Sequence, residues 1–211
     1  MVEQFGDVIE ESAGAGDGGN RSSGPSDEDL IERFQRGDLY AFDLIVKRYK
    51  DQLLNFVFRF VGNQEEAEDI VQETFLRVYR KRHAYKRVAK FSTWIYTISG
   101  NLARTELRRR KRRKLFSVTD MGFEDKDFEI SDEAFNPEDR AHGILQEEII
   151  QREIEALSPK FREVILLRDV QELSYDEISK IVNVPIGTVK SRVNRGRLKL
   201  QIKLRDLMRN R

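Results

Sequence analysis

The sequence predicts an all-α protein built from two small helical domains joined by a flexible acidic linker. Apolar residues recur at helical spacing through most of the chain, and capping residues and glycines separate the segments. No stretch of any length alternates apolar and polar residues as a half-buried strand does. A loss of periodicity between the two helical parts predicts the linker.

Composition excludes several classes of protein. Hydrophobic residues make up 39% of the chain and charged residues 36%, which is typical of a soluble protein with modest apolar cores. No stretch approaches the roughly 18 consecutive apolar residues of a membrane-spanning helix. The acidic, glycine-rich N-terminus lacks the features of a signal peptide. The absence of cysteine excludes disulfides, thiolate catalysis and cysteine zinc sites, and it agrees with a cytoplasmic location.

Charge is distributed in blocks, although the net charge is only +1. Eight basic residues and one acid lie within 104–114, nine acids and one base within 120–139, and nine bases and one acid within 186–211. Two basic blocks separated by an acidic one indicate two anion-binding surfaces and a connector. Solvated helix faces are the alternative interpretation of each block.

The first helical domain is expected at 26–114, after a disordered tail at 1–25 that is rich in glycine, serine and aspartate. Ser26 is a good N-cap for the first helix, the acids that follow it suit the helix dipole, and Gly37 ends the helix. Three more helices are expected to complete this domain.

The second helix is expected at 41–61, where Gly62 stops it. Asn63 then caps the third helix, with Glu66 in the capping-box position. After a short polar loop, a fourth helix begins at the motif FSTWIYTISGN and ends in the basic run that closes the domain.

The linker is expected at 115–139 and the second domain at 140–211. A helix is expected to run through GILQEEIIQREIEAL. Pro159 restarts the chain as the first residue of the next helix, a position that proline favours, and KFREVILLRDV continues that helix.

The segment 174–197 is typical of a DNA-binding helix-turn-helix. Ser174 and Glu177 form a capping box, and an Asn-Val-Pro break separates the two helices. Val189 and Val193 are four residues apart, so they pack inward from one face of the second helix. An ordinary helical hairpin with a solvated face is the alternative. The opposite face carries the hydrogen-bonding and basic side chains that major-groove readout requires, with Thr188 at its margin: Lys190, Ser191, Asn194 and Arg195.

Aromatic residues accompany the basic run of the first domain. Such pairs suit unstacked single-stranded bases, because every base has a π-face and the backbone is anionic. Phe91 and Tyr96 are expected in the core, whereas Tyr85, in a polar loop, is expected to offer a free stacking face.

Five motifs together resemble the extracytoplasmic-function sigma factors of bacterial RNA polymerase, close to the sigma-E-like group. The resemblance covers about 27–208 and rests on these motifs, in order: GDLYAFDLIVKRY (37–49), AEDIVQETFLRVYR (67–80), FSTWIYTISGN (91–101), LSPKFREVILLRDVQELSYDEIS (157–179) and GTVKSRVNRGR (187–197).

The resemblance implies that the domains are sigma regions 2 and 4, which bind core RNA polymerase and promoter DNA. Region 4 reads the −35 element with the helix-turn-helix face described above. An anti-sigma factor, possibly anchored in the membrane, is a further expected partner. Residues expected to dock on polymerase are Asp69, Gln72 and Glu73. Residues expected at the −10 element are Tyr85, Trp94, Asn101, Arg108 and Arg109.

Four positions depart from the family pattern. Arg87 and Val88 replace a Gly-Asp type of turn that is often seen in the loop, and Thr105 stands where an acid is common. Lys190 replaces a frequent arginine, which weakens bidentate recognition of guanine.

Two other classes of function fit the sequence less well. A free-standing DNA-binding regulator predicts operator binding without polymerase, but the first domain has no ligand-binding signature. An enzyme would need a nucleophile motif, a phosphate loop or a metal constellation, and the sequence contains none. We therefore expect no catalytic residues, no metal and no cofactor.

Overall fold

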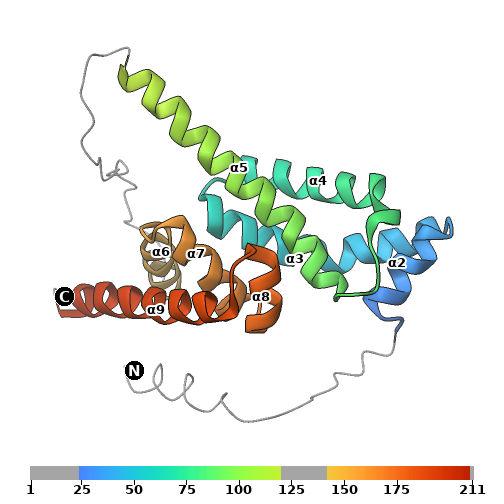
Figure 1. The fold of residues 1–211 in the computed structure, drawn as a ribbon. Coiled ribbons are helices and arrows are strands. Elements are labelled where there is room, and N and C mark those ends of the chain that lie inside the picture. The colour runs from blue at the N-terminus through green and yellow to red at the C-terminus, as the bar shows by residue number, and fades with distance from the viewer. Residues whose placement is uncertain (1–23, 120–141, 210–211) are drawn as a thin grey trace, which may run out of the picture.

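The computed structural model describes residues 24–119 and 142–209, and it describes side chains within 24–113 and 149–205. The expected tail and most of the linker lie outside these residues. The described residues are all-α, as predicted, and contain these elements (Figure 1): α2 (Asp27–Gln35), α3 (Leu39–Val61), α4 (Gln64–Arg80), the 3-10 helix η1 (Arg82–Ala84), α5 (Phe91–Thr119), α6 (His142–Glu155), α7 (Pro159–Ile165), the π-helical turn η2 (Leu166–Val170), α8 (Tyr175–Val182) and α9 (Ile186–Arg209).

The predicted caps start the helices. The Ser26 hydroxyl accepts from the backbone N–H of Asp29, whose carboxylate accepts in return from Ser26 N–H. Asn63 accepts from the N–H of Glu66 at 2.9 Å. The Glu66 carboxylate, however, accepts a hydrogen bond from Arg110 of α5. A charge-assisted bond to another helix thus engages the side chain that was expected to complete the local capping box.

Three helix boundaries differ from the sequence prediction. α3 begins at Leu39 because Asp38 is its N-cap and accepts from Ala41 N–H at 3.2 Å. α5 continues to Thr119, five residues into the expected linker. The helix expected through KFREVILLRDV is instead α7 followed by η2, where the backbone widens into a π-helical turn.

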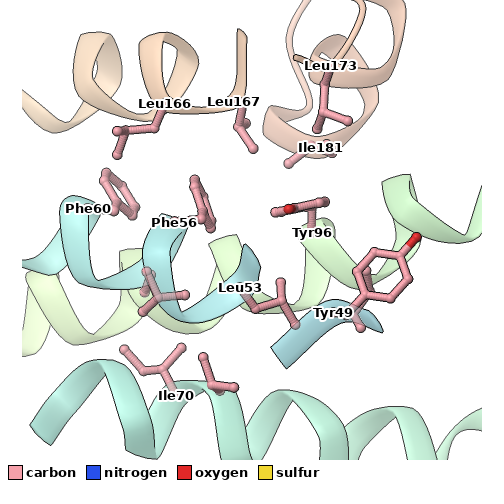
Figure 2. Close-up of a cluster of buried hydrophobic side chains, with 14 of the residues drawn as sticks. Tyr49, Leu53, Phe56, Phe60, Ile70, Tyr96, Leu166, Leu167, Leu173 and Ile181 are labelled. Carbon is pink, nitrogen blue, oxygen red and sulfur yellow. The ribbon is translucent and has the colours of Figure 1, made fainter. Parts of the chain in front are cut away.

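The first domain is organised around α3. This helix packs against α2, α4 and α5, and its buried side chains form the centre of the core. Leu53, Phe56 and Phe60 are fully buried, and Ile70 of α4 covers them from one side (Figure 2). The C-terminal part of α5 extends away from the other helices (Figure 1).

The second domain packs directly on the first. Leu166 and Leu167 of η2 lie over Phe56 and Phe60 of α3, so the apolar core is continuous from α4 to the second domain (Figure 2). α8 packs along α5, where Ile181 lies near Tyr96 (Figures 1 and 2).

Polar groups also join the domains. Arg162 is only 9% exposed, and its guanidinium donates to the backbone carbonyl of Phe60 at 2.7 Å. Arg104 of α5 forms an ion pair with the buried carboxylate of Glu163, and Lys90 lies 3.2 Å from Glu177. No local pattern in the sequence predicts this contact between the two domains.

Candidate nucleic-acid and polymerase interface

The helix-turn-helix forms where the sequence predicts it. The Ser174 and Glu177 capping box starts α8, and Asn183 ends it in the left-handed conformation, with φ of 52°. Asparagine tolerates this backbone better than most residues. The Ser179 hydroxyl donates to the carbonyl of Val184 at 2.6 Å, which fixes the turn before Pro185 leads into α9.

Burial separates the two faces of α9 as predicted. Val189 and Val193 are fully buried between α9 and its neighbours. The opposite face contains Thr188, which is half-buried, and four exposed residues: Lys190, Ser191, Asn194 and Arg195. One face therefore anchors the helix, and the other presents donors and acceptors to a partner.

α9 packs closely against α7 of the same domain. A Cβ atom added at Gly196 would lie 2.8 Å from Cγ1 of Ile165 in α7, closer than carbon atoms normally approach. Near the start of α9, the Lys190 Nζ lies 5.8 Å from the ring centroid of Tyr175, a cation–π distance. The exposed face therefore stands on a rigid support.

A stripe of polar and aromatic residues follows one face of α5. Trp94, Asn101 and Arg108 are spaced by seven residues, or about two helical turns. Asn101 is exposed, and its side-chain oxygen accepts from Arg104 Nη2 at 2.7 Å. Arg108 is exposed, and the exposed Arg109 lies 3.2 Å from Glu106. The stripe presents an amide and cations to solvent.

Tyr85 lies in a different environment from the one predicted. It is only 5% exposed, and its ring packs on Phe91 and Trp94 with centroid distances of 5.7 and 5.5 Å. Its hydroxyl donates to the carbonyl of Ala89 at 2.8 Å. Burial raises the pKa of Tyr85 to about 12. The free stacking face expected from the sequence is absent, because the aromatic residues of α5 enclose the ring.

An exposed face of α4 contains the residues expected to meet polymerase. Asp69 and Gln72 are exposed, and Glu73 is half-buried. Glu73 accepts a hydrogen bond from Arg77 at 2.7 Å, which lowers the pKa of its carboxyl below the usual range. Both acids of this face are four residues apart and lie on one side of the helix.

Both domains match models of known families. Residues 45–113 match Sigma-70 region 2, and residues 147–200 match Sigma-70 region 4. The chain is 39% identical to the ECF RNA polymerase sigma factor SigW of Bacillus subtilis, over 84% of this chain and 96% of the relative. It is 36% identical to the ECF RNA polymerase sigma-E factor of Escherichia coli K12, over 87% and 97%. The chain belongs to the extracytoplasmic-function sigma factors. It is therefore an RNA polymerase sigma factor that directs promoter-specific initiation of transcription, with core polymerase and promoter DNA as its partners.

A solved structure agrees with this assignment. The sigma factor RpoE of Bartonella quintana, solved in complex with the anti-sigma factor NepR, superposes with a TM-score of 0.62 at 27% identity. The match covers 78% of this sigma factor and 96% of that chain. In the described part of this sigma factor, no helix is long and apolar enough to cross a membrane.

The basic run of the sigma factor has two structural roles. Arg108 and Arg109 point to solvent, whereas Arg110 donates to the carbonyl of Val61 at 3.0 Å and pairs with Glu66. Only part of the run is therefore available to DNA. The helical repeat predicts this difference between the arginines, because residues two positions apart, such as Arg108 and Arg110, lie on different sides of a helix.

Side chains of α2 that contact the loop between α4 and α5 are functional residues that the sequence does not predict. Gln35 donates to backbone carbonyls of this loop, and Glu28 accepts from the first N–H of α5. These partners are 47 to 63 residues apart in the sequence, so no local pattern indicates them.

Proposed function

We propose that the sigma factor divides its work among three helices: α4 docks on polymerase, α5 and the loop before it bind the −10 element, and α9 reads the −35 element. The observation that supports the proposal most directly is on α9. Two buried valines anchor one face, and the opposite face presents the exposed set of Lys190, Ser191, Asn194 and Arg195, with Thr188 at its edge. Lysine and arginine suit guanine, asparagine suits adenine, and serine and threonine suit either.

At the −10 element, Asn101 supplies both a donor and an acceptor for base edges. Arg108 and Arg109 supply charge for the phosphate backbone. Trp94 is half-buried and offers part of its ring for stacking. Tyr85 supports the site from within the aromatic cluster, since its ring is enclosed.

At the polymerase, Asp69 and Glu73 present two carboxylates to a basic surface, and Gln72 adds hydrogen bonds from the same face of α4.

Transcription in vitro tests the division of work. Core polymerase is supplied with a pool of genomic fragments, with and without the sigma factor, and run-off transcripts are sequenced. We expect a set of start sites that depends on the sigma factor and shares −35 and −10 elements. Operator binding without polymerase, together with no start site that depends on the chain, would support a free-standing regulator instead.

An anti-sigma factor is a further proposed partner, because the similar Bartonella sigma factor was solved in complex with one. We also propose that the protein works in the cytoplasm, where its polymerase and promoters are, and that it has no catalytic activity or cofactor of its own. Affinity capture from the native cell, with the tagged sigma factor as bait, tests the anti-sigma partner.

A further inference from the structure

Helix α2 holds both ends of the loop between α4 and α5, residues 81–90. The side-chain amide of Gln35 donates to the carbonyl of Arg82 at 2.7 Å and to that of Tyr85 at 3.1 Å. At the other end, the Glu28 carboxylate accepts from the N–H of Phe91 at 2.8 Å, the first residue of α5. One nine-residue helix thus sets where the loop starts and where it stops.

The middle of the loop contacts the same helix. The Arg87 guanidinium lies 3.3 Å from the Asp29 carboxylate and 3.2 Å from that of Glu32. These ion pairs are exposed, so each stabilises the loop only slightly. The hydrogen bonds of Gln35 and Glu28 are partly buried and satisfy backbone groups, so they restrain the loop more strongly.

The loop exposes Val88 to solvent, and not Tyr85 as the sequence predicts. Tyr85 points inward and bonds to Ala89, whereas Val88 at the tip is 86% exposed. Among the exposed large hydrophobic side chains in the described part of the chain, Val88 has the highest exposed fraction. Exposed apolar side chains on DNA-binding surfaces pack against unstacked bases or the thymine methyl group.

We propose that α2 is a positioning element for −10 recognition, in which Gln35 and Glu28 hold the loop so that Val88 contacts an unpaired promoter base. The inference rests on the proposed −10 role of this loop. A loop that is ordered before it binds loses less conformational entropy on binding, and it holds its contacts in one geometry, which sharpens discrimination between bases. Gln35 and Glu28 touch no base in this arrangement, and Val88 is the loop residue that contributes to specificity, in addition to Asn101 of α5.

The test uses the full-length sigma factor with core polymerase. A promoter library keeps the −35 element constant and varies each −10 position, and transcript ratios report the base preference. The variants are Gln35→Leu, Glu28→Leu, Glu28→Gln and Val88→Ala. Arg33→Ala is the matched control, because Arg33 lies on α2 but pairs with Asp38. Circular dichroism and affinity for core polymerase are measured for every variant.

We expect wild-type discrimination at a contacted base of roughly 5- to 150-fold, the range that single mismatches produce at protein–DNA interfaces. Gln35→Leu and Glu28→Leu should each move this ratio towards one, that is, towards equal transcription with every base at that position. Glu28→Gln should retain it, since the amide oxygen still accepts from Phe91. Val88→Ala should change preference at one −10 position. Core affinity, −35 preference and the Arg33→Ala profile should not change.

Two results would overturn the inference. If Gln35→Leu and Glu28→Leu lower transcription equally from every promoter, α2 contributes only stability. If Val88→Ala leaves the −10 base preference unchanged, the tip of the loop does not contact a base. A different result would count against the proposed function itself. In that case the wild-type sigma factor would show a normal −35 preference but no preference among bases at any −10 position.

Discussion

Burial separates the side chains of α9 into those that pack against the domain and those that face solvent. Val189 and Val193 are fully buried, and Arg195, two residues after Val193, is exposed. Gly196 comes next and lies against Ile165, where a larger residue has no room. Neighbours in sequence therefore make different contacts, because each step along a helix turns the side chain by about 100°.

Arg195→Ala tests direct readout of the −35 element. If the guanidinium makes a bidentate contact to guanine, the change should weaken promoter binding by about 1–3 kcal/mol, and the loss should occur at one −35 position. Binding of the polymerase holoenzyme to a set of single-base −35 variants measures both effects. Equal weakening on every variant would indicate a phosphate contact instead.

Gly196→Ala tests the close approach of α9 to α7. The new methyl group would overlap Ile165, so we expect it to lower the free energy of unfolding by about 1–3 kcal/mol relative to Gly187→Ala. Gly187 is the matched control in the same helix, because a Cβ there meets nothing within 4 Å. Urea denaturation of the full-length variants measures the difference, and equal stability would show that Ile165 moves aside freely.

Helices of this sigma factor combine a packing face with a contact face. α4 buries Ala67, Ile70, Val71, Thr74 and Val78, whereas Asp69 is exposed and Glu73 is half-buried. A charge change on the contact face should therefore alter partner binding without disturbing the core. Surface substitutions of this kind usually change stability by no more than about 0.5 kcal/mol.

Asp69→Lys combined with Glu73→Lys tests α4 as the polymerase contact. Reversal of both charges should abolish core binding and transcription, because like charges then face each other across the interface. Helicity should remain, as circular dichroism can show. Asp51→Lys, at an exposed position of α3, serves as the control. Unchanged affinity of the double variant for core polymerase would remove α4 from the interface.

At the scale of the whole molecule, the described structure is a docked arrangement of the two domains. The buried carboxyl of Glu163 lies at this interface, beside Gly100 and Arg104 of α5. Burial raises the pKa of Glu163 to about 7, although the charges of Arg104 and Arg192 oppose the shift. Separation of the domains exposes this carboxyl and returns its pKa toward the ordinary value of a glutamate.

Domain docking should therefore depend on pH. Between about pH 5 and 7 the docked state binds more protons than the separated state, so docking is strongest at the acidic end, weakens as the pH rises to about 7, and changes little above it. Glu163→Gln should remove this dependence and keep the domains docked at about pH 8.

Energy transfer between two dyes measures the docking. The native chain has no cysteine, so Asp51→Cys and Gln201→Cys, both at exposed positions, label the two domains uniquely. Transfer that falls as the pH rises, and that stays constant in the Glu163→Gln variant, is the expected result. Equal transfer at every pH in the otherwise wild-type chain would contradict it.

Local sequence determined most of the helices and the helix-turn-helix. Ser26, Asn63 and Ser174 act as caps on groups three residues away, and Val189 and Val193 pack inward because helical periodicity places them on one face. These features depend on neighbours within one or two turns. They were predictable for that reason, and so was the family, whose motifs lie on the same elements.

Tertiary structure alone decided which side chains of the candidate site are free. Tyr85 is enclosed by Phe91 and Trp94, Arg110 turns to Glu66, and Gln35 bonds to a loop almost 50 residues away. Docking of the domains likewise joins Arg104 to a carboxylate 59 residues further along. Each of these contacts depends on helix packing between distant segments, and the local pattern of residues does not specify that geometry.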